Sequence, residues 1–270
     1  MSWVAAVLLG IVQGLTEFLP VSSSAHLVLA RAFFGWNVDE GAFGLAFDVA
    51  LHAGTLIAIV VFFWRDLLAI VAALPDVLRA SRGPGKVGRL IVIGTLPVVV
   101  FGVTVASYME QHWRTPAVIA TTLIVGALWL MAAERFGSKD RTEDALTPGG
   151  ALLVGVAQST ALVPGMSRSG STMSMAMLFG LTRESAARFS FLLGVPAIGA
   201  AAAKEGLHLL KAGLTPHDAG LFLLGMTVSA IVGYATIRFF LRYLAAHSLD
   251  AFAYYRLALA AVTIAWLMTR

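Results

Sequence analysis

The chain has 270 residues, of which 59% are hydrophobic and only 13% are charged, and its mean hydropathy is +0.84. This composition lies far outside that of water-soluble domains and predicts an all-α polytopic membrane protein. The small net charge of +4 gives no argument for nucleic-acid binding, and the lack of cysteine excludes disulfides, a thiol nucleophile and a cysteine-ligated zinc site.

The apolar runs fall into two similar halves along the chain. The first half starts with stretches at about 2–16 and 22–34, which are each too short to cross a bilayer and therefore predict a re-entrant hairpin. Three longer runs follow at about 45–64, 87–106 and 116–135. The second half repeats this order, with a split pair at about 149–163 and 167–180 and longer runs at about 187–207, 218–240 and 250–269.

This order predicts one integral membrane domain over residues 1–270, with six transmembrane helices plus two re-entrant helical hairpins in an inverted repeat. The first repeat covers 1–136, with its hairpin at 2–34, and the second covers 148–270, with its hairpin at 149–180. Because each repeat has an odd number of crossings, the second repeat has to enter the membrane with opposite topology. The two hairpin turns then approach from opposite faces and meet.

Aligning Gly10 with Gly155 brings the polar residues of the two hairpins into register. The aligned pairs are Gln13 with Gln158, Ser22 with Ser167, Ser23 with Arg168 and Ser24 with Ser169. The two copies differ in chemistry, because the first carries a carboxylate and an imidazole whereas the second carries an arginine. Chance similarity between two apolar, serine-rich helices is the alternative.

Basic residues set the expected orientation. They crowd the connection between the first and second crossings, at Arg65, Arg79, Arg82, Lys86 and Arg89. This connection should therefore be cytoplasmic, so both termini lie outside and the first hairpin enters from the outer face. A site between the hairpins is expected to open to that outer side. Arg114 and Arg256 are expected at membrane–water interfaces.

The second hairpin carries PGMSRSGST at residues 164–172, which places a fixed positive charge and several hydroxyls in an apolar sequence. An arginine at membrane depth is costly and by default marks a functional site. The proline and glycines interrupt regular helix and free backbone N–H groups. Together with these groups, a phosphate cradle is predicted from the side chains of Ser167, Arg168, Ser169 and Thr172. A kinked helix whose arginine reaches the interface is the alternative.

The first hairpin supplies the groups that the second lacks. Gln13 and Glu17 are four residues apart and share one helix face. Ser23 and His26 are three apart at the start of the following helix, so hydroxyl and imidazole can lie on one face. A serine activated by a nearby histidine is a recurring nucleophile arrangement.

GIVQGLTEFLPVSSSAH at residues 10–26 and PGMSRSGST at 164–172 resemble the two signature motifs of the undecaprenyl-diphosphate phosphatase family, the bacitracin-resistance type. FDVALHAGT at 47–55 adds to this resemblance, which covers essentially the whole chain. Members of that family are bacterial inner-membrane enzymes that remove the terminal phosphate from undecaprenyl diphosphate and so regenerate the lipid carrier for wall synthesis. The resemblance implies functional positions at Glu17, Ser23, His26, Ser167, Arg168 and Thr172.

The resemblance also implies a divalent cation, Mg²⁺ or Ca²⁺. The first acidic position of the family motif is Gln13 here, so Glu17 is the one carboxylate expected to hold a metal. Asp48 and His52, four residues apart, are further candidates to line the cavity, with helix capping by Asp48 as the alternative. The expected partners are a polyprenyl diphosphate lipid and the bilayer, without nucleic acid, and a homodimer is left open.

The expected mechanism is covalent. His26 takes the proton from Ser23, which attacks the terminal phosphorus, and water later hydrolyses the phosphoserine. Arg168 neutralises the diphosphate, and further substrate contacts are expected from Gln13, Ser22, Ser24, Ser167, Ser169 and Thr172. Direct attack by water, activated by His26 or Glu17, is the rival chemistry. A lipid-phosphate transporter or flippase is the alternative function, because inverted repeats with re-entrant hairpins are typical of secondary transporters.

Overall fold

The computed structural model describes residues 1–35, 42–212 and 215–269, and the regular elements within these ranges are all helical. The first half contains α1 (Trp3–Thr16), α2 (Ser23–Phe34), α3 (Ala42–Phe62), α4 (Trp64–Ala72), α5 (Gly83–Thr104), α6 (Ala106–His112) and α7 (Pro116–Phe136). The second half contains α8 (Pro148–Ser159), α9 (Arg168–Leu178), α10 (Arg183–Ala212), α11 (Pro216–Leu244) and α12 (Asp250–Met268). Short 3₁₀ turns lie at Leu74–Asp76, Glu143–Ala145 and Thr160–Leu162. The predicted all-α architecture is confirmed.

Three helices begin at the same local signal, a threonine followed by a proline. Thr115, Thr147 and Thr215 are the N-caps of α7, α8 and α11, and each side chain accepts a hydrogen bond from the backbone N–H three residues further on. The proline that follows has a backbone angle suited to a helix and lacks the N–H that would otherwise be unpaired there. These pairs fix where the three helices start.

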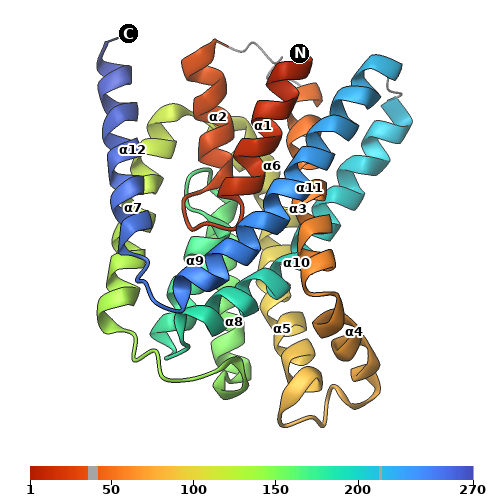
Figure 1. The fold of residues 1–270 in the computed structure, drawn as a ribbon, viewed down its shortest axis with the longest axis vertical. Helices are drawn as coiled ribbons and strands as arrows, with labels where there is room; N and C mark the ends of the chain where they lie inside the picture. The colour runs from red at the N-terminus through yellow and green to blue at the C-terminus, as the bar shows by residue number, and fades with distance from the viewer. Residues whose placement is uncertain (36–41, 213–214, 270) are drawn as a thin grey trace.

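Among the described residues, five helices are long and apolar enough to cross a membrane, namely α5, α7, α10, α11 and α12. A sixth candidate span is α3 taken with α4, and this pair bends by 75° at Phe63. α4 has no buried residue, and it lies at one end of the molecule (Figure 1). The chain is therefore a multi-pass membrane protein. The helices α1, α2, α8 and α9 have only 11 to 14 residues and α6 has 7, too few to cross a bilayer.

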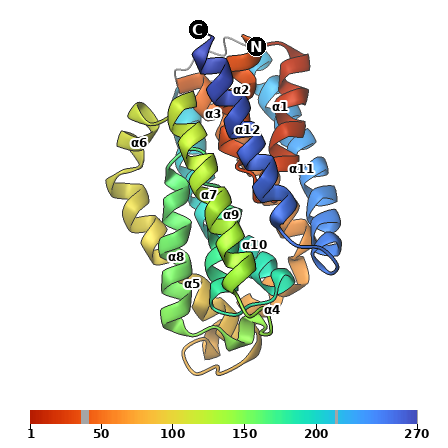
Figure 2. The same cartoon turned by 90° about the vertical axis from the view of Figure 1, so that its left-hand side faces the viewer.

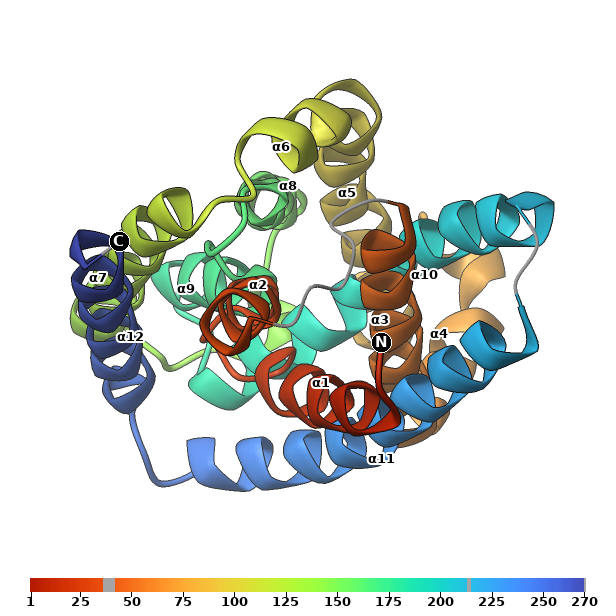
Figure 3. The same cartoon turned by 90° about the horizontal axis from the view of Figure 1, so that it is seen from above.

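The short helices form two hairpins that enter the bundle from opposite ends (Figures 1 and 2). α1 and α2 extend from the end where both chain termini lie, whereas α8 and α9 extend from the other end. Seen from above, α2 and α9 lie near the centre, with the longer helices around them (Figure 3). The turns of the two hairpins therefore meet inside the molecule.

The longer helices hold the two hairpins in matching ways. α1 packs along α11 and α8 packs along α5, while α3 contacts α10 and α7 contacts α12. Glycines permit this close packing. A Cβ atom added at Gly155 of α8 would lie 2.2 Å from the carbonyl oxygen of Gly94 on α5, and one at Gly14 of α1 would lie 2.9 Å from the carbonyl oxygen of Ser229 on α11. Both hairpins thus rest directly on the backbone of a longer helix.

Candidate active site

The second helix of each hairpin starts with the same unusual backbone geometry. Ser22 caps α2 with φ 74° and ψ 96°, and Ser167 caps α9 with φ 72° and ψ 110°. The Ser22 side chain accepts a hydrogen bond from the Ala25 N–H at 3.4 Å, and the Ser167 side chain accepts one from the Gly170 N–H at 3.1 Å. A positive φ is costly for a residue with a side chain and tends to be retained at functional sites. The two turns therefore share one strained conformation.

The two turns also contact each other. Ser169 Oγ in the second hairpin donates to the carbonyl oxygen of Leu19 in the first, at 3.1 Å. In return, the backbone N–H of Gly165 donates to Ser24 Oγ at 3.4 Å. The turns, 141 and 150 residues apart along the chain at these contacts, are thus joined into one unit.

Arg256 on α12 contacts the backbone of both turns. Its side chain is fully buried, and the guanidinium donates to the carbonyl oxygens of Pro20 at 3.2 Å, Gly165 at 3.0 Å and Met166 at 3.2 Å, and to two carbonyls of α7. Gly126 on α7 makes room, because a Cβ atom there would lie 1.9 Å from Arg256 Nη2. The expectation that Arg256 lies at a membrane interface is wrong: the arginine is in the interior because five carbonyl groups satisfy its donors.

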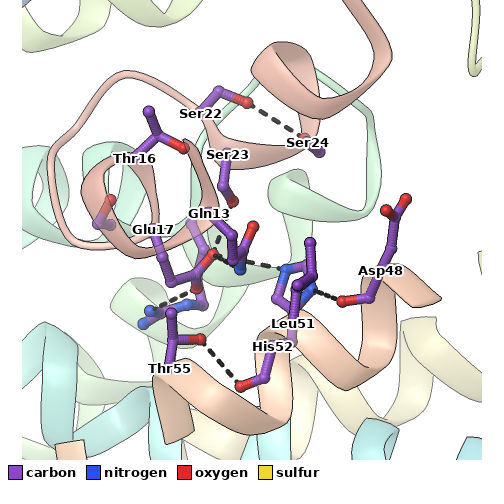
Figure 4. A network of polar contacts seen from close by, with 12 residues as sticks. Gln13, Thr16, Glu17, Ser22, Ser23, Ser24, Asp48, Leu51, His52 and Thr55 are labelled. Atoms are coloured by element: carbon purple, nitrogen blue, oxygen red, sulfur yellow. Dashed lines mark hydrogen bonds and ion pairs between the residues drawn. The ribbon is translucent and has the colours of Figure 1, made fainter. Parts of the chain in front are cut away.

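The Glu17 carboxylate contacts four other polar side chains near the two turns (Figure 4). Its Oε2 accepts from Ser23 Oγ at 2.6 Å and from Gln13 Nε2 at 3.2 Å, and His52 Nε2 lies 3.5 Å from the same oxygen. Its Oε1 accepts from Arg168 Nη2 at 3.1 Å. The carboxylate is buried and thus joins the serine of the first hairpin to the arginine of the second.

Arg168 is fixed by the residues around it. Its Nη1 donates to the backbone carbonyl of Ser190 on α10 at 3.0 Å. Thr172 Oγ1 donates to the Arg168 carbonyl at 2.7 Å and lies 2.5 Å from Ser190 Oγ. Thr172 is fully buried and is not among the residues that line the cavity, so its contacts hold α9 against α10. The sequence predicts Thr172 as a substrate contact, whereas in the structure its side chain contacts the Arg168 carbonyl and Ser190.

A cavity of about 290 Å³ lies where the turns meet. Its polar lining residues are Glu17, Ser22, Ser23, Ser24, Asp48, His52, Arg114, Gln158, Ser167, Arg168 and Ser169. Its apolar lining residues are Leu27, Val49, Val98, Ala106, Ala161, Leu162, Pro164, Ala197, Ile198 and Ala201. The first residues of α2, Ser23 and Ser24, and of α9, Arg168 and Ser169, belong to this wall, and the first N–H groups of a helix have no acceptor within their own helix. The cavity is thus suited to an anion with an apolar attachment.

His26 is not positioned as the expected base for Ser23. Its Nδ1 lies 2.7 Å from the Ser22 carbonyl oxygen, and its Nε2 lies 2.7 Å from the hydroxyl of Tyr255. The imidazole also stacks on the Tyr255 ring, with an interplanar angle of 4°. Ser23 and His26 lie three residues apart in α2, but each side chain has another hydrogen-bond partner, which for Ser23 is Glu17 and for His26 is Tyr255. The predicted Ser23–His26 contact is therefore wrong.

A second charged cluster lies on the cavity wall, and the sequence identified only part of it. Asp48 is buried and accepts hydrogen bonds from the guanidinium groups of both Arg31 and Arg114. Its backbone carbonyl contacts His52 Nδ1 at 2.7 Å, which links this cluster to Glu17. Arg114 was expected at an interface, but it lines the cavity. The spacing of Asp48 and His52 was the available signal, whereas Arg31 comes from α2 and Arg114 from the connection between α6 and α7.

The residues around Glu17 offer few metal ligands. Among the described residues, no group of three or more histidine, aspartate, glutamate or cysteine side chains could hold a metal ion. Gln13, predicted as a substrate contact, is fully buried and is not among the residues that line the cavity, and its Nε2 contacts Glu17 while its Oε1 has no hydrogen-bond partner. Mg²⁺ in proteins is often held by one or two carboxylates together with substrate phosphates. The donor set fits a cation that binds with a phosphate ligand, but not a cage made by the protein alone.

The sequence is similar to a known protein family and to several relatives over nearly its whole length. The sequence profile of the family described as bacitracin resistance protein BacA matches residues 6–262. A protein of Rubrobacter xylanophilus is 46% identical over 267 residues, which cover 97% of each chain. One of Alcanivorax borkumensis is 44% identical over 99% of this chain and 100% of its own, and one of Moorella thermoacetica is 42% identical over 99% of each. Each of these relatives is named undecaprenyl-diphosphatase.

Proposed function

The chain belongs to the bacitracin resistance protein BacA family, and we propose that it hydrolyses undecaprenyl diphosphate to undecaprenyl phosphate and inorganic phosphate. The reaction recycles the lipid carrier of cell-wall synthesis and confers bacitracin resistance. The observation that carries this proposal is the contact of Ser23 with Glu17, and of Glu17 with Arg168, on the wall of one cavity. A hydroxyl, a carboxylate and a guanidinium can act as nucleophile, base and charge-stabilising group in phosphoryl transfer to a serine.

The cavity offers separate surfaces to the two parts of this substrate. The diphosphate binds where Arg168 and the N-terminal N–H groups of α2 and α9 converge, because these carry positive charge or partial charge. The first isoprene units lie against the apolar wall from α5, α6 and α10, formed by Val98, Ala106, Ala197, Ile198 and Ala201. Ser22, Ser24 and Ser167 donate to the remaining phosphate oxygens, whereas the Ser169 hydroxyl lines the same wall and donates to the Leu19 carbonyl.

Ser23 is the nucleophile and Glu17 the base in the reaction that this geometry supports. Glu17 Oε2, which accepts the Ser23 hydroxyl at 2.6 Å, takes its proton as Oγ attacks the terminal phosphorus. The Oγ–P bond forms, the bond from phosphorus to the bridging oxygen breaks, and undecaprenyl phosphate leaves with that oxygen. Arg168 stabilises the charge on the transferred group.

A second step restores the enzyme. Glu17 first passes the Ser23 proton to the departing undecaprenyl phosphate, then accepts a proton from the water that attacks the phosphoserine, and returns it to the Ser23 oxygen as the Oγ–P bond breaks and inorganic phosphate is released. His26 orients the start of α2 through the Ser22 carbonyl and has no direct part in either step. Attack by water activated by Glu17, without a phosphoserine, is the rival route, and substitution of Ser23 separates the two.

A divalent cation, Mg²⁺ or Ca²⁺, completes the proposed site. Glu17, the carboxylate on the cavity wall next to Arg168, would hold it together with the diphosphate oxygens. The cation would supply neutralisation of the phosphate charge.

The proposed layout in the membrane is six spans and two re-entrant hairpins, with repeats over 1–136 and 148–270. The entry of the hairpins from opposite ends, the shared geometry of Ser22 and Ser167, and the equivalent contacts of α1 with α11 and of α8 with α5 support it. The basic residues of 65–89 favour a cytoplasmic location for that connection in a bacterial cell. The cavity then opens to the periplasmic side of the inner membrane.

Phosphate release by the purified protein in detergent tests the proposed function. A polyprenyl diphosphate substrate should yield inorganic phosphate, and Arg168→Ala should abolish the release. No transport is possible in detergent, so a lipid-phosphate transporter or flippase would give no phosphate. Absence of phosphate release from correctly folded protein would contradict the proposal.

A further inference from the structure

Gln158 has a polar side chain that the interior of the protein leaves without a partner. It lies in the last turn of α8, is 1% exposed and lines the cavity. Neither its Nε2 nor its Oε1 has a hydrogen-bond partner. Burying an unpaired amide costs free energy, so a buried amide of this kind calls for an explanation, such as a ligand that binds it.

The inverted repeat explains why this amide is free. The first-repeat counterpart, Gln13, donates from Nε2 to Glu17 Oε2 at 3.2 Å. Glu17 lies seven residues after Gly10 in the first repeat. The residue seven positions after Gly155 in the second repeat is Leu162. Leu162 also lines the cavity and offers no acceptor. Loss of the acid therefore leaves the Gln158 N–H groups without an internal acceptor, at a wall that receives an anion.

We propose that Gln158 is a substrate-binding residue whose Nε2 donates to a non-bridging oxygen of the diphosphate. This inference rests on the proposed function, because the ligand is the substrate of that reaction. A neutral donor suits this position, since Glu17 already neutralises part of the Arg168 charge, and an added carboxylate would repel the phosphates. Gln158 contributes to binding in the ground state and the transition state alike, so its effect falls on KM.

Gln158→Leu tests the proposal, because leucine removes both unpaired polar atoms and keeps a similar volume. We expect KM for the polyprenyl diphosphate to rise about tenfold with kcat nearly unchanged, while the midpoint of thermal unfolding, Tm, stays equal or rises. Gln158→Glu should raise KM further through repulsion. The combination of equal or higher stability with weaker binding is not what a purely structural residue would give.

Ser174→Ala is the matched control. Ser174 is also fully buried, its Oγ also lacks a partner, and it does not line the cavity. This variant should change neither KM nor kcat. Wild-type KM in Gln158→Leu, from protein that is folded by its Tm, would overturn the inference. Wild-type protein without any phosphate release would instead contradict the proposed function, so the two failures are distinguishable.

Discussion

Arg256→Lys is the substitution whose effect can be worked out most fully from the contacts. The guanidinium of Arg256 contacts five backbone carbonyls, three of them in the two hairpin turns. A lysine ammonium has three donors, so at least two carbonyls lose their partner. At about 1 kcal/mol for each net hydrogen bond, the loss is about 2 kcal/mol of stability. The positive charge is retained, so the variant measures the effect of losing the planar guanidinium with its several N–H donors.

The turns carry Ser23 and Arg168, so looser turns should also slow the reaction. A displacement on the order of 1 Å at a reacting group can cost about a hundredfold in rate. We therefore expect Arg256→Lys to lower kcat at least about tenfold and to lower Tm by several degrees. The assays are phosphate release in detergent and thermal unfolding of the same preparation.

Two comparisons make this prediction specific. Arg238→Lys, on an exposed position of α11, should change neither quantity. Arg256→Ala should be inactive, and free guanidinium ion should restore part of its turnover by occupying the vacated space. Wild-type kcat and Tm in Arg256→Lys would refute the reasoning, because the carbonyl contacts would then contribute neither to stability nor to the position of the turns.

Three further predictions concern the phosphate site, the packing and the cation. Arg168→Lys keeps the charge but loses the fork that contacts Glu17 and Ser190, so turnover should fall at least about tenfold; unchanged turnover would exclude a bidentate role. Gly155→Ala would place a Cβ atom 2.2 Å from the Gly94 carbonyl oxygen, so Tm should fall, and a Tm equal to that of the wild type would show that α8 can shift freely. Treatment with EDTA should reduce phosphate release, and added Mg²⁺ or Ca²⁺ should restore it; full activity after chelation would remove the cation from the proposal.

The sequence predicted the helices and the two polar turns because their signals are local. Apolar runs of about twenty residues identify spans, and the motifs at 10–26 and 164–172 mark the breaks between short helices. Seven of the predicted site residues line one cavity, namely Glu17, Ser22, Ser23, Ser24, Ser167, Arg168 and Ser169. Their roles in binding and catalysis stay predictions.

The misses come from contacts between residues far apart along the chain. Arg256 lies 236 residues from Pro20, and no spacing rule indicates that its side chain would turn inward to the hairpin turns. The Ser23–His26 pairing failed for a different reason. Helical spacing fixes which side of α2 the two residues share, but the rotamers follow the nearest partners, which are Glu17 and Tyr255.

The central claim is that Ser23 and Glu17 act as one nucleophile–base unit. It is tested most directly by the turnover of Ser23→Ala, Glu17→Gln and the double variant, with His26→Ala measured beside them. Because residues that act as a unit are not additive, the first three should each lose about a thousandfold or more, and the double variant should lose little beyond either single one. His26→Ala should lose less. Near-normal turnover in Ser23→Ala would contradict the covalent route, and an additive double variant would contradict the pairing of Ser23 with Glu17.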